Sequence, residues 1–326
     1  MNILITGGGG FLGQRVARDL LAQGDTVNAR GERAAIKRIT LLDLSEPPNA
    51  IRDPRINFVR GEVSNHGAVA EALGMDTDGI FHLAAVVSGQ AESDFELGMR
   101  VNLDGFRVVL ESCRKVGNRP RLLFASSIAV FGTPLPDLIT DSTTPTPQAS
   151  YGVQKLIGEW LTADYNRKGY IDGRAVRIPT VSVRPGKANA AASSFASAVI
   201  REPLNGIDYG CPVPPETLMW MCSPAKVVAN LMRAYELPSA AFGELRALSL
   251  PGITVSVREM VDSLRRLGGE TAAARVRYIK DERIQAIVRT WAAKLDTPRA
   301  LGMGFTADKT MDEIVAQYIR DENIKP

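Results

Sequence analysis

The sequence predicts an α/β protein whose core is a doubly wound parallel β-sheet with helices on both faces. Short apolar runs alternate with segments of helical periodicity over roughly the first 180 residues. A glycine-rich turn joins the first apolar run to the first helical segment. A later apolar run, Gly79–Val87, is nearly continuous, as is typical of a strand that is buried on both faces. We expect a first domain over residues 1–183 and a smaller lobe over residues 184–326.

Composition narrows the class of protein. Hydrophobic residues make up 45% of the 326 positions and charged residues 23%, as in an ordinary globular protein. The net charge of +3, from 39 basic and 36 acidic residues, gives no reason to expect a nucleic-acid partner. Neither a membrane-spanning apolar stretch nor a cleavable leader is evident, so we expect a cytoplasmic protein without a membrane anchor. Three cysteines without C-x-x-C spacing and two histidines indicate neither disulfides nor a metal site.

The first thirteen residues, MNILITGGGGFLG, combine a strand, a glycine-rich turn and the start of a helix. Gly7, Gly10 and Gly13 follow the spacing of a dinucleotide-binding turn, and a register starting one residue later fits as well. The first glycine permits a tight turn, the second lets the backbone approach a pyrophosphate, and the third lets the helix pack on the strand. Free N–H groups at the helix start, around Phe11 and Leu12, would bind the pyrophosphate. The sequence therefore predicts a Rossmann dinucleotide-binding domain.

The second strand, Ile39–Leu44, carries an acidic residue that indicates which dinucleotide binds. Asp43 lies where a carboxylate binds the adenosine ribose diol, and it would repel a 2′-phosphate, which favours NAD over NADP. Asp43 lies farther along the chain from the glycine-rich turn than this acidic residue usually does, because the polar stretch Asn28–Lys37 lengthens the connection. An alternative rests on basic residues that would accommodate a 2′-phosphate, namely Arg30, Arg33, Lys37 and Arg38. We interpret these four as a solvated basic connection.

Further strands and a long helix complete the first domain. Ala84 and Ala85, in the strand Gly79–Val87, are small enough to let a flat ring lie against the backbone. His82 in the same strand is a candidate catalytic residue, but we interpret it as a core histidine at a strand end. Thr133–Ser150 is a long loop without periodicity. The other expected elements are strands at Ile56–Val59, Arg121–Ser127 and Arg174–Val183, a helix at Phe95–Val116, and lobe helices near 225–237, 257–267, 283–294 and 307–320.

A tyrosine and a lysine at helical spacing form the second anchor of the sequence. Tyr151 and Lys155 share one face of a predicted helix, and none of the other six tyrosines has a lysine four residues later. A buried ammonium beside a phenol lowers the phenol's pKa, so that the tyrosine can act as a general base on an alcohol. Ser127 ends the strand before this helix and would hydrogen-bond the reacting oxygen. We expect Lys155 also to hold the nicotinamide ribose.

Five motifs together resemble the extended short-chain dehydrogenase/reductase superfamily, which contains sugar-nucleotide epimerases and dehydratases. The resemblance covers about the first 190 residues. Dehydratases of this superfamily carry an Asp-Glu pair where this chain has Ile128 and Ala129, so we do not expect dehydration. The motifs are Thr6-Gly7-x-x-Gly10-x-x-Gly13, His82-Leu83-Ala84-Ala85, Val101-Asn102-x-x-Gly105, Ser126-Ser127-x-x-Val130-Phe131-Gly132 and Tyr151-x-x-x-Lys155.

The resemblance implies roles for particular residues. It implies a catalytic set of Ser127, Tyr151 and Lys155, with Asn102 positioning a water molecule or the catalytic helix. It implies a homodimer formed through the helices around 95–116 and 151–168, which a monomer at micromolar concentration would contradict. Its adenine contact stands at Glu62, where the superfamily usually has aspartate. The other cofactor contacts that it implies are Val63, Leu83, Ala84, Ala85, Pro179 and Val181.

The substrate residues are expected downstream of these motifs. Residues 177–206 resemble NAD-dependent dehydrogenases that oxidise the C2 hydroxyl of a small four-carbon sugar acid. Arg184 would bind the carboxylate, while Asn189 and Ser193 would hydrogen-bond hydroxyls. A nucleotide-sugar 4-epimerase, which shares all the motifs, is the alternative enzyme. A cofactor-sensing regulator without catalysis is a further alternative, but relatives of that kind typically lose the tyrosine or the lysine.

Overall fold

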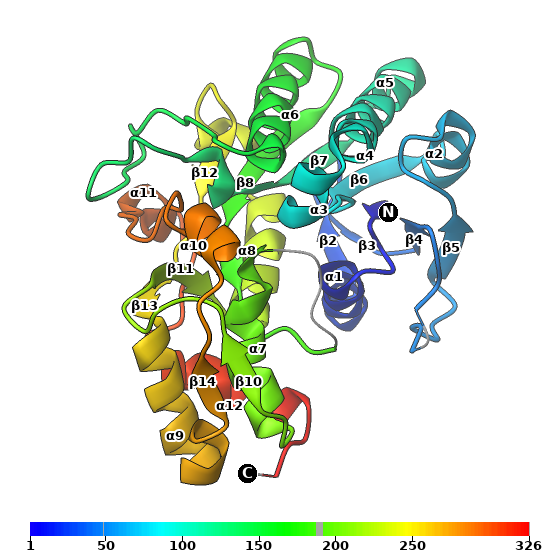
Figure 1. Ribbon diagram of the computed structural model, residues 1–326. Helices are drawn as coiled ribbons and strands as arrows, with labels where there is room; N and C mark the ends of the chain where they lie inside the picture. Colours follow the sequence, from blue (N-terminus) through cyan, green and yellow to red (C-terminus); the bar gives the residue numbers. More distant parts are fainter. Residues whose placement is uncertain (48, 187–191, 326) are drawn as a thin grey trace. The chain divides into compact units, whose positions relative to one another are not determined.

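The structure is a computed structural model that describes residues 1–47, 49–186 and 192–325 (Figure 1). The chain forms two compact units. The first comprises Met1–Ser127, Ser150–Arg177 and Val228–Leu248, and the second comprises Ile128–Ala149, Ile178–Val227 and Ser249–Pro326. The chain therefore passes between the units several times, and residues 228–248 belong with the dinucleotide-type unit although they follow residue 183.

A seven-stranded, mostly parallel sheet forms the centre of the first unit, which confirms the predicted fold class. Its strand order is β12-β8-β7-β6-β1-β4-β5, so the order reverses beside β1, as in a doubly wound sheet. Parallel pairing of β1 with both β4 and β6 brings the carboxyl ends of these strands to one edge. The strands are β1 (Asn2–Thr6), β4 (Arg38–Asp43), β5 (Ile56–Arg60), β6 (Thr77–His82), β7 (Arg121–Ser127), β8 (Asp172–Ile178) and β12 (Ala247–Ser249).

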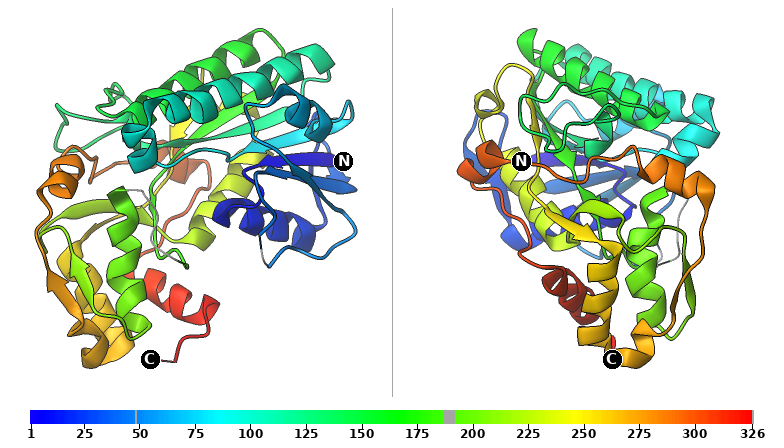
Figure 2. Two further views of the ribbon diagram at one scale, coloured as in Figure 1. Left: turned by 45° about the vertical axis from the view of Figure 1, so that its right-hand side comes forward. Right: turned by 60° about the vertical axis from the view of Figure 1, so that its left-hand side comes forward.

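Helices cover both faces of this sheet, as predicted (Figure 2). On one face, Leu4 and Ile80 of the strands pack with Phe106 and Val109 in a continuous apolar cluster. On the other face the ring of Phe81 stacks on Tyr235, with centroids 4.6 Å apart. Successive residues of β6 thus point to opposite layers, which explains its continuous apolar run. The helices of this unit are α1 (Phe11–Gln23), α2 (His66–Ala72), α3 (Ser88–Ser93), α4 (Phe95–Gly98), α5 (Gly105–Val116), α6 (Ser150–Arg167) and most of α8 (Pro224–Glu236).

Three predicted elements differ from the structure. The strand predicted over Gly79–Val87 ends at His82, because beyond Leu83 the backbone N–H groups of Ala84 and Val86 bond to side chains rather than to a neighbouring strand. The helix predicted over Phe95–Val116 is divided by a π-helical segment, η1 (Met99–Asp104). The strand predicted over Arg174–Val183 breaks at Pro179, which has no N–H to continue the ladder. Residues beyond this proline form β9 (Thr180–Val181) in another sheet.

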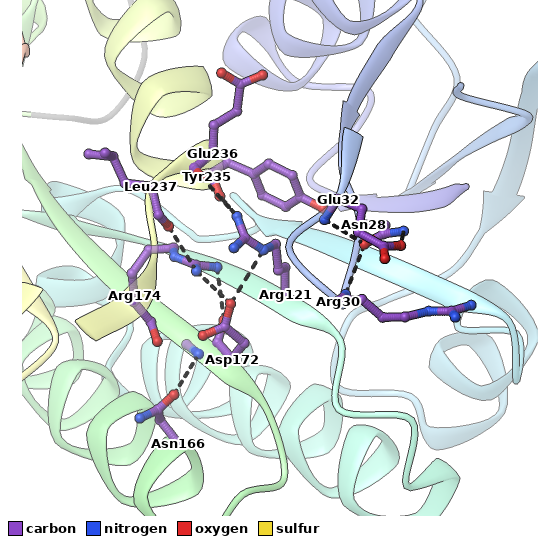
Figure 3. Close-up of polar contacts among 12 residues, drawn as sticks. Asn28, Arg30, Glu32, Arg121, Asn166, Asp172, Arg174, Tyr235, Glu236 and Leu237 are labelled. Atoms are coloured by element: carbon purple, nitrogen blue, oxygen red, sulfur yellow. Dashed lines mark hydrogen bonds and ion pairs between the residues drawn. The ribbon is translucent and has the colours of Figure 1, made fainter. Parts of the chain in front are cut away.

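The polar stretch before β4 forms a hairpin that the sequence did not predict, β2 (Asp25–Val27) with β3 (Arg33–Ala35). Arg33 pairs with Asp25 at 2.6 Å and with Glu236 at 3.1 Å, and Arg30 lies in the exposed hairpin loop (Figure 3). Arg38 begins β4, whereas Asp43 ends it, so the two are roughly 16 Å apart. The basic residues therefore lie at the end of the strand opposite to Asp43, as a solvated connection should.

Two buried arginines attach α8 to the first unit. Arg121 Nη1 donates to the carbonyl oxygens of Tyr235 at 2.8 Å and Glu236 at 3.0 Å, at the C-terminus of α8. Arg174 is fully buried and donates to Leu237 O and to Asp172 Oδ2, which also pairs with Arg121 (Figure 3). Cations at a helix C-terminus satisfy its free carbonyl groups. These contacts explain why residues 228–248 return to the first unit.

The second unit has its own apolar core, which includes Phe195, Met260 and Ile314. Three of the four expected lobe helices, near 257–267, 283–294 and 307–320, are present in this unit, whereas the one expected near 225–237 is α8, most of which belongs to the first unit. Helix α7 and the short strands were not predicted, because they lie in a proline-rich or irregular pattern. The loop Thr133–Ser150 was predicted as such and forms one isolated bridge, Ile139 to Leu295. The elements are β9, β10 (Tyr209–Cys211), β11 (Leu218–Cys222), β13 (Ile253–Ser256), β14 (Val276–Tyr278), α7 (Phe195–Leu204), α9 (Val257–Ala273), α10 (Glu282–Val288), α11 (Pro298–Gly302) and α12 (Met311–Asp321).

Candidate active site

Ser127, Tyr151 and Lys155 lie on two elements of the first unit, β7 and α6, that contact each other. Ser127 is the last residue of β7, and Tyr151 is the second residue of α6, with Lys155 one turn later. Lys155 Nζ donates to the carbonyl oxygen of Ala125, near the end of β7, at 2.8 Å. The same ammonium lies 5.5 Å from the centroid of the Tyr151 ring. The lysine therefore connects the helix that carries the tyrosine to the strand that carries the serine.

Lys155 is a buried cation. Its side chain is 3% exposed, and burial lowers the pKa of its ammonium group to about 8, so it remains mostly protonated at pH 7. The Ala125 carbonyl accepts one of its hydrogens, and the ring of Phe124 lies 5.0 Å from Nζ, within the range of a cation–π contact. A desolvated positive charge beside a phenol favours the ionised form of that phenol.

A buried ion pair anchors α6 to the sheet. Glu159 lies one turn after Lys155 and accepts hydrogen bonds from Arg177 Nε at 2.9 Å and Arg177 Nη2 at 2.7 Å. Ser126 Oγ donates to the same carboxylate at 2.5 Å. Because Ser126 lies on β7 and Arg177 on β8, one carboxylate joins two strands to α6. Burying such a pair is costly unless its hydrogen bonds are satisfied, as they are at this carboxylate.

Asn102 connects the loop after β6 with α6. It is 3% exposed and lies in the π-helical segment η1, a feature that is frequent at functional sites. Its Oδ1 accepts from Val86 N at 2.8 Å, and its Nδ2 donates to Val86 O at 3.2 Å and to Gln154 Oε1 at 2.8 Å. Both amide hydrogens are thus bonded to protein oxygens, which favours the positioning of the helix over the binding of water as its role.

The glycine turn is shaped by close backbone contacts. Gly7 has φ of +70°, and a Cβ there would lie 2.8 Å from Ala84 N. A Cβ at Gly13 would overlap the carbonyl oxygen of Gly7, so α1 packs on the turn only because this residue has no side chain. A Cβ at Gly10 would meet only Gly7 O, at 3.2 Å. The protein's own packing therefore requires glycine at positions 7 and 13 far more than at position 10.

Asp43 lies beside the glycine turn, at the carboxyl end of β4. Its Oδ2 accepts from Gly9 N at 2.9 Å and its Oδ1 from Leu44 N at 2.7 Å. The helix α1 begins after Gly10 with no side-chain cap, so its first N–H groups, which include those of Phe11 and Leu12, point out of the helix end. A carboxylate and a set of backbone donors therefore lie side by side, which suits a ribose and an adjacent pyrophosphate.

The loop after β6 packs against this turn. Leu83 N donates to Thr6 O at 3.1 Å, and Ala84 N donates to Thr6 Oγ1 at 3.3 Å. Ala85 follows in the same loop and is partly exposed. His82, at the end of β6, is buried, and its Nδ1 hydrogen-bonds Thr6 Oγ1 at 2.9 Å. Burial, with the neighbouring Lys155 cation, lowers the pKa of His82 to about 3, so this histidine is a neutral core residue at pH 7.

The remaining residues expected at the cofactor are distributed over several loops. Glu62 accepts from Arg100 Nε at 3.0 Å, and this hydrogen bond lowers the pKa of its carboxyl group. Val63 is buried in the core beside Gly105, so only its backbone is available to a ligand. Pro179 lies at the break between β8 and β9, and Val181 is the last residue of β9; both are in the second unit.

The expected substrate residues lie in the second unit. Arg184 is held by its backbone, because its N–H donates to Ser197 Oγ at 3.0 Å and its carbonyl accepts from Arg201 Nη1 at 2.9 Å. Ser193 lies in the short 3₁₀ helix that precedes α7. Asn189 lies outside the described residues.

No group of three or more metal-ligating side chains is found among the described residues, and no helix there is long and apolar enough to cross a membrane.

The sequence pattern did not reveal four residues whose side chains bond α6 to neighbouring elements. These are Ser126, Gln154, Glu159 and Arg177. A signal was available for two of them, because Gln154 and Glu159 are polar residues within the same helix as Tyr151 and Lys155. The partners of these residues lie far away in sequence and could not be assigned without the fold.

Comparison with known proteins identifies the class. A model of the NAD dependent epimerase/dehydratase family matches residues 3–220, and the chain belongs to this family. Two relatives are dehydrogenases that align over nearly the whole chain. The D-erythronate dehydrogenase of Cupriavidus necator is 51% identical over 324 residues, covering 99% of each protein. That of Haemophilus influenzae is 42% identical and covers 98% of this chain and 99% of its own. This chain is likewise a dehydrogenase.

A solved structure whose sequence is less similar to this chain than those of the two dehydrogenases carries a different name. It is the nucleoside-diphosphate-sugar epimerase from Agrobacterium tumefaciens, which matches with a TM-score of 0.91 and 39% identity. The alignment covers 99% of this chain and 94% of that one. This similarity supports the same fold over the whole chain. The name of that protein corresponds to the alternative activity, a nucleotide-sugar 4-epimerase.

Proposed function

We propose that the protein oxidises the C2 hydroxyl of D-erythronate to 2-keto-D-erythronate with NAD as the oxidant and Tyr151 as the general base. The buried Lys155 ammonium beside the Tyr151 ring is the observation that carries the proposed chemistry. The choice of substrate is supported by the two D-erythronate dehydrogenases that align over nearly the whole chain.

The residues of the first unit fit NAD. The backbone at Gly10 has no side chain to obstruct a pyrophosphate beside the first N–H groups of α1, and Asp43 lies next to the same turn. The carboxylate at Asp43 favours a ribose with a free 2′-hydroxyl over a 2′-phosphate. Because Arg33 and Arg38 are paired with carboxylates at the other end of β4, they do not offset this preference.

In the proposed reaction, Tyr151 and Ser127 act on the oxygen at C2, and Lys155 acts through Tyr151. Tyr151 removes the hydroxyl proton, and Ser127 donates a hydrogen bond to the oxygen as the C=O bond forms. Lys155 stabilises the phenolate of Tyr151 and hydrogen-bonds the nicotinamide ribose. When bound, NAD supplies the acceptor for the hydride that leaves C2.

We assign the substrate's polar groups to the second unit. Arg184 would bind the carboxylate, since a guanidinium pairs well with a carboxylate, and its backbone is held at both ends by α7. Ser193 and Asn189 would hydrogen-bond the hydroxyls.

The proposed homodimer is supported by three exposed apolar side chains on α4 and α6, namely Phe95 at 60%, Val153 at 41% and Trp160 at 57%.

The alternative function is a nucleotide-sugar 4-epimerase, favoured by the name of the structural relative from Agrobacterium tumefaciens. An epimerase of this kind retains tightly bound NAD and returns the hydride to its substrate, so it forms no net NADH. The two functions therefore differ in a quantity that absorbance measures directly.

The experiment that tests the proposed function is the initial rate of NADH formation over a panel of C4 and C5 aldonates. We expect D-erythronate to give the highest kcat/KM, and NADP to be used at least about tenfold less well, equivalent to 1.4 kcal/mol. A protein that forms no NADH with any aldonate, but interconverts nucleotide sugars without net reduction, would be the epimerase.

Tyr151→Phe removes the proposed base with little change of shape. We expect kcat to fall by about 10²-fold or more, since a positioned general base contributes about that much. Tyr165→Phe is the matched control, because Tyr165 lies on the same helix and donates to Glu111 rather than facing the reaction. Near-wild-type kcat in Tyr151→Phe would remove Tyr151 as the base.

Gly10→Ala and Gly13→Ala separate cofactor binding from folding. Gly10 has φ of −74°, which alanine adopts readily, so we expect an unfolding free energy within about 1 kcal/mol of the wild type. The new methyl group would still obstruct the pyrophosphate and raise the Kd for NAD roughly tenfold. Gly13→Ala should instead lower the unfolding free energy by about 1–3 kcal/mol, because its Cβ overlaps Gly7 O. Unchanged NAD affinity in Gly10→Ala, measured by calorimetric titration, would reject this position for the pyrophosphate.

A further inference from the structure

We propose that Gln154 is a positioning residue for the reaction, which holds the loop after β6 at a set distance from the catalytic helix by acting through Asn102. Gln154 lies between Tyr151 and Lys155 in sequence and is 1% exposed. The inference rests on the proposed function, since it concerns the geometry of the same hydride transfer.

The connection consists of three hydrogen bonds through one amide group. Val86 N–H and C=O bond the two ends of the Asn102 amide at 2.8 and 3.2 Å, much as a neighbouring strand would. The second hydrogen of Asn102 Nδ2 goes to Gln154 Oε1 at 2.8 Å. An amide nitrogen has two hydrogens, so Gln154 uses the last donor that Asn102 has. The loop, the π-helical segment η1 and α6 are thereby joined in series.

The Gln154 side chain occupies a buried position that is unfavourable for its amide group. Its Nε2 is buried and has no hydrogen-bond partner among the described residues, which costs free energy that an apolar side chain of similar size would avoid. The amide also needs space, because a Cβ at Gly98 would lie 2.7 Å from Nε2 and 3.1 Å from Ala91 Cβ. The bond from Asn102 to Gln154 Oε1 is the contact that this position gains in return.

The loop and α6, which this connection joins, belong to the two parts of the proposed site: the cofactor-binding turn and the catalytic residues. At one end, the loop holds Ala84 against Gly7 of the glycine turn. At the other end, α6 carries Tyr151 and Lys155. Reacting atoms must lie about 3–3.5 Å apart, and a displacement of about 1 Å costs much of the rate. Loss of the Gln154 bond should therefore lower kcat, while NAD affinity, which depends mainly on the glycine turn and Asp43, should change little.

Gln154→Met tests the inference because methionine has a similar length and lacks the acceptor. Thr162→Val is the matched control: Thr162 is fully buried on the same helix, and its Oγ1 donates to Gly158 O at 2.8 Å. We expect Gln154→Met to lower kcat about tenfold, equivalent to 1.4 kcal/mol, with the KM for NAD within about twofold and the pH–rate profile unshifted. Thr162→Val should keep the wild-type kcat.

Two further measurements isolate the route through Asn102. The double variant Asn102→Ala/Gln154→Met should be no slower than Asn102→Ala alone, since residues that act in series are not additive. In the protein without cofactor, exchange of the Val86 amide hydrogen should be faster in Gln154→Met by about tenfold and unchanged in Thr162→Val.

Distinct outcomes would overturn the inference and the proposed function. Wild-type kcat together with unchanged Val86 exchange in Gln154→Met would overturn the positioning role. Equal losses of kcat in Gln154→Met and in the control Thr162→Val would overturn it as well. Absence of NADH formation from D-erythronate by the wild-type protein would reject the proposed function. The exchange measurement requires no substrate, so it decides the role of Gln154 in that case as well.

Discussion

The buried ammonium group of Lys155 is the interaction on which the rest of the first unit depends. Taking a cation out of water is unfavourable, and the lowered pKa of about 8 reflects that cost. The Ala125 carbonyl and the rings of Phe124 and Tyr151 partly offset it, but only while α6 stays close to the end of β7. A small separation would let water reach the ammonium and weaken its effect on the phenol.

Several contacts maintain that proximity, and they act on different sides of α6. The Glu159–Arg177 pair and Ser126 hold it to β7 and β8. The Asn102–Gln154 bond holds it to the loop after β6 and, through Ala84, to the glycine turn. Glu92 of α3 accepts from Ser150 N, where α6 begins. The glycine turn, the loop after β6, the ends of β7 and β8, and α6 are thus joined by a connected set of polar contacts.

The fold was predictable from the sequence, and so was the centre of the candidate site, because their signals are local. The glycine turn, Asp43, and the Tyr151–Lys155 spacing each lie within one strand or helix, and periodicity distinguishes the two kinds of element. The hairpin β2–β3 was not predictable, because contacts with Glu236 far along the chain stabilise it. The π-helical segment at Asn102 depends similarly on partners in two other elements. Residues that we propose to bind substrate, such as Arg184, lie in irregular segments, where spacing says little about which side chains meet.

In the proposed mechanism, the Lys155 ammonium makes Tyr151 a base near neutral pH. The most direct measurement is the pH dependence of kcat for the wild type and Lys155→Met at saturating NAD. Without the cation the phenol should be harder to ionise, so we expect the acidic limb of the profile to move up by about one pH unit or more. Part of the lost activity should then return between pH 8 and pH 10, a range set by the ordinary tyrosine pKa of about 10. An acidic limb at the same pH in both proteins would contradict the account.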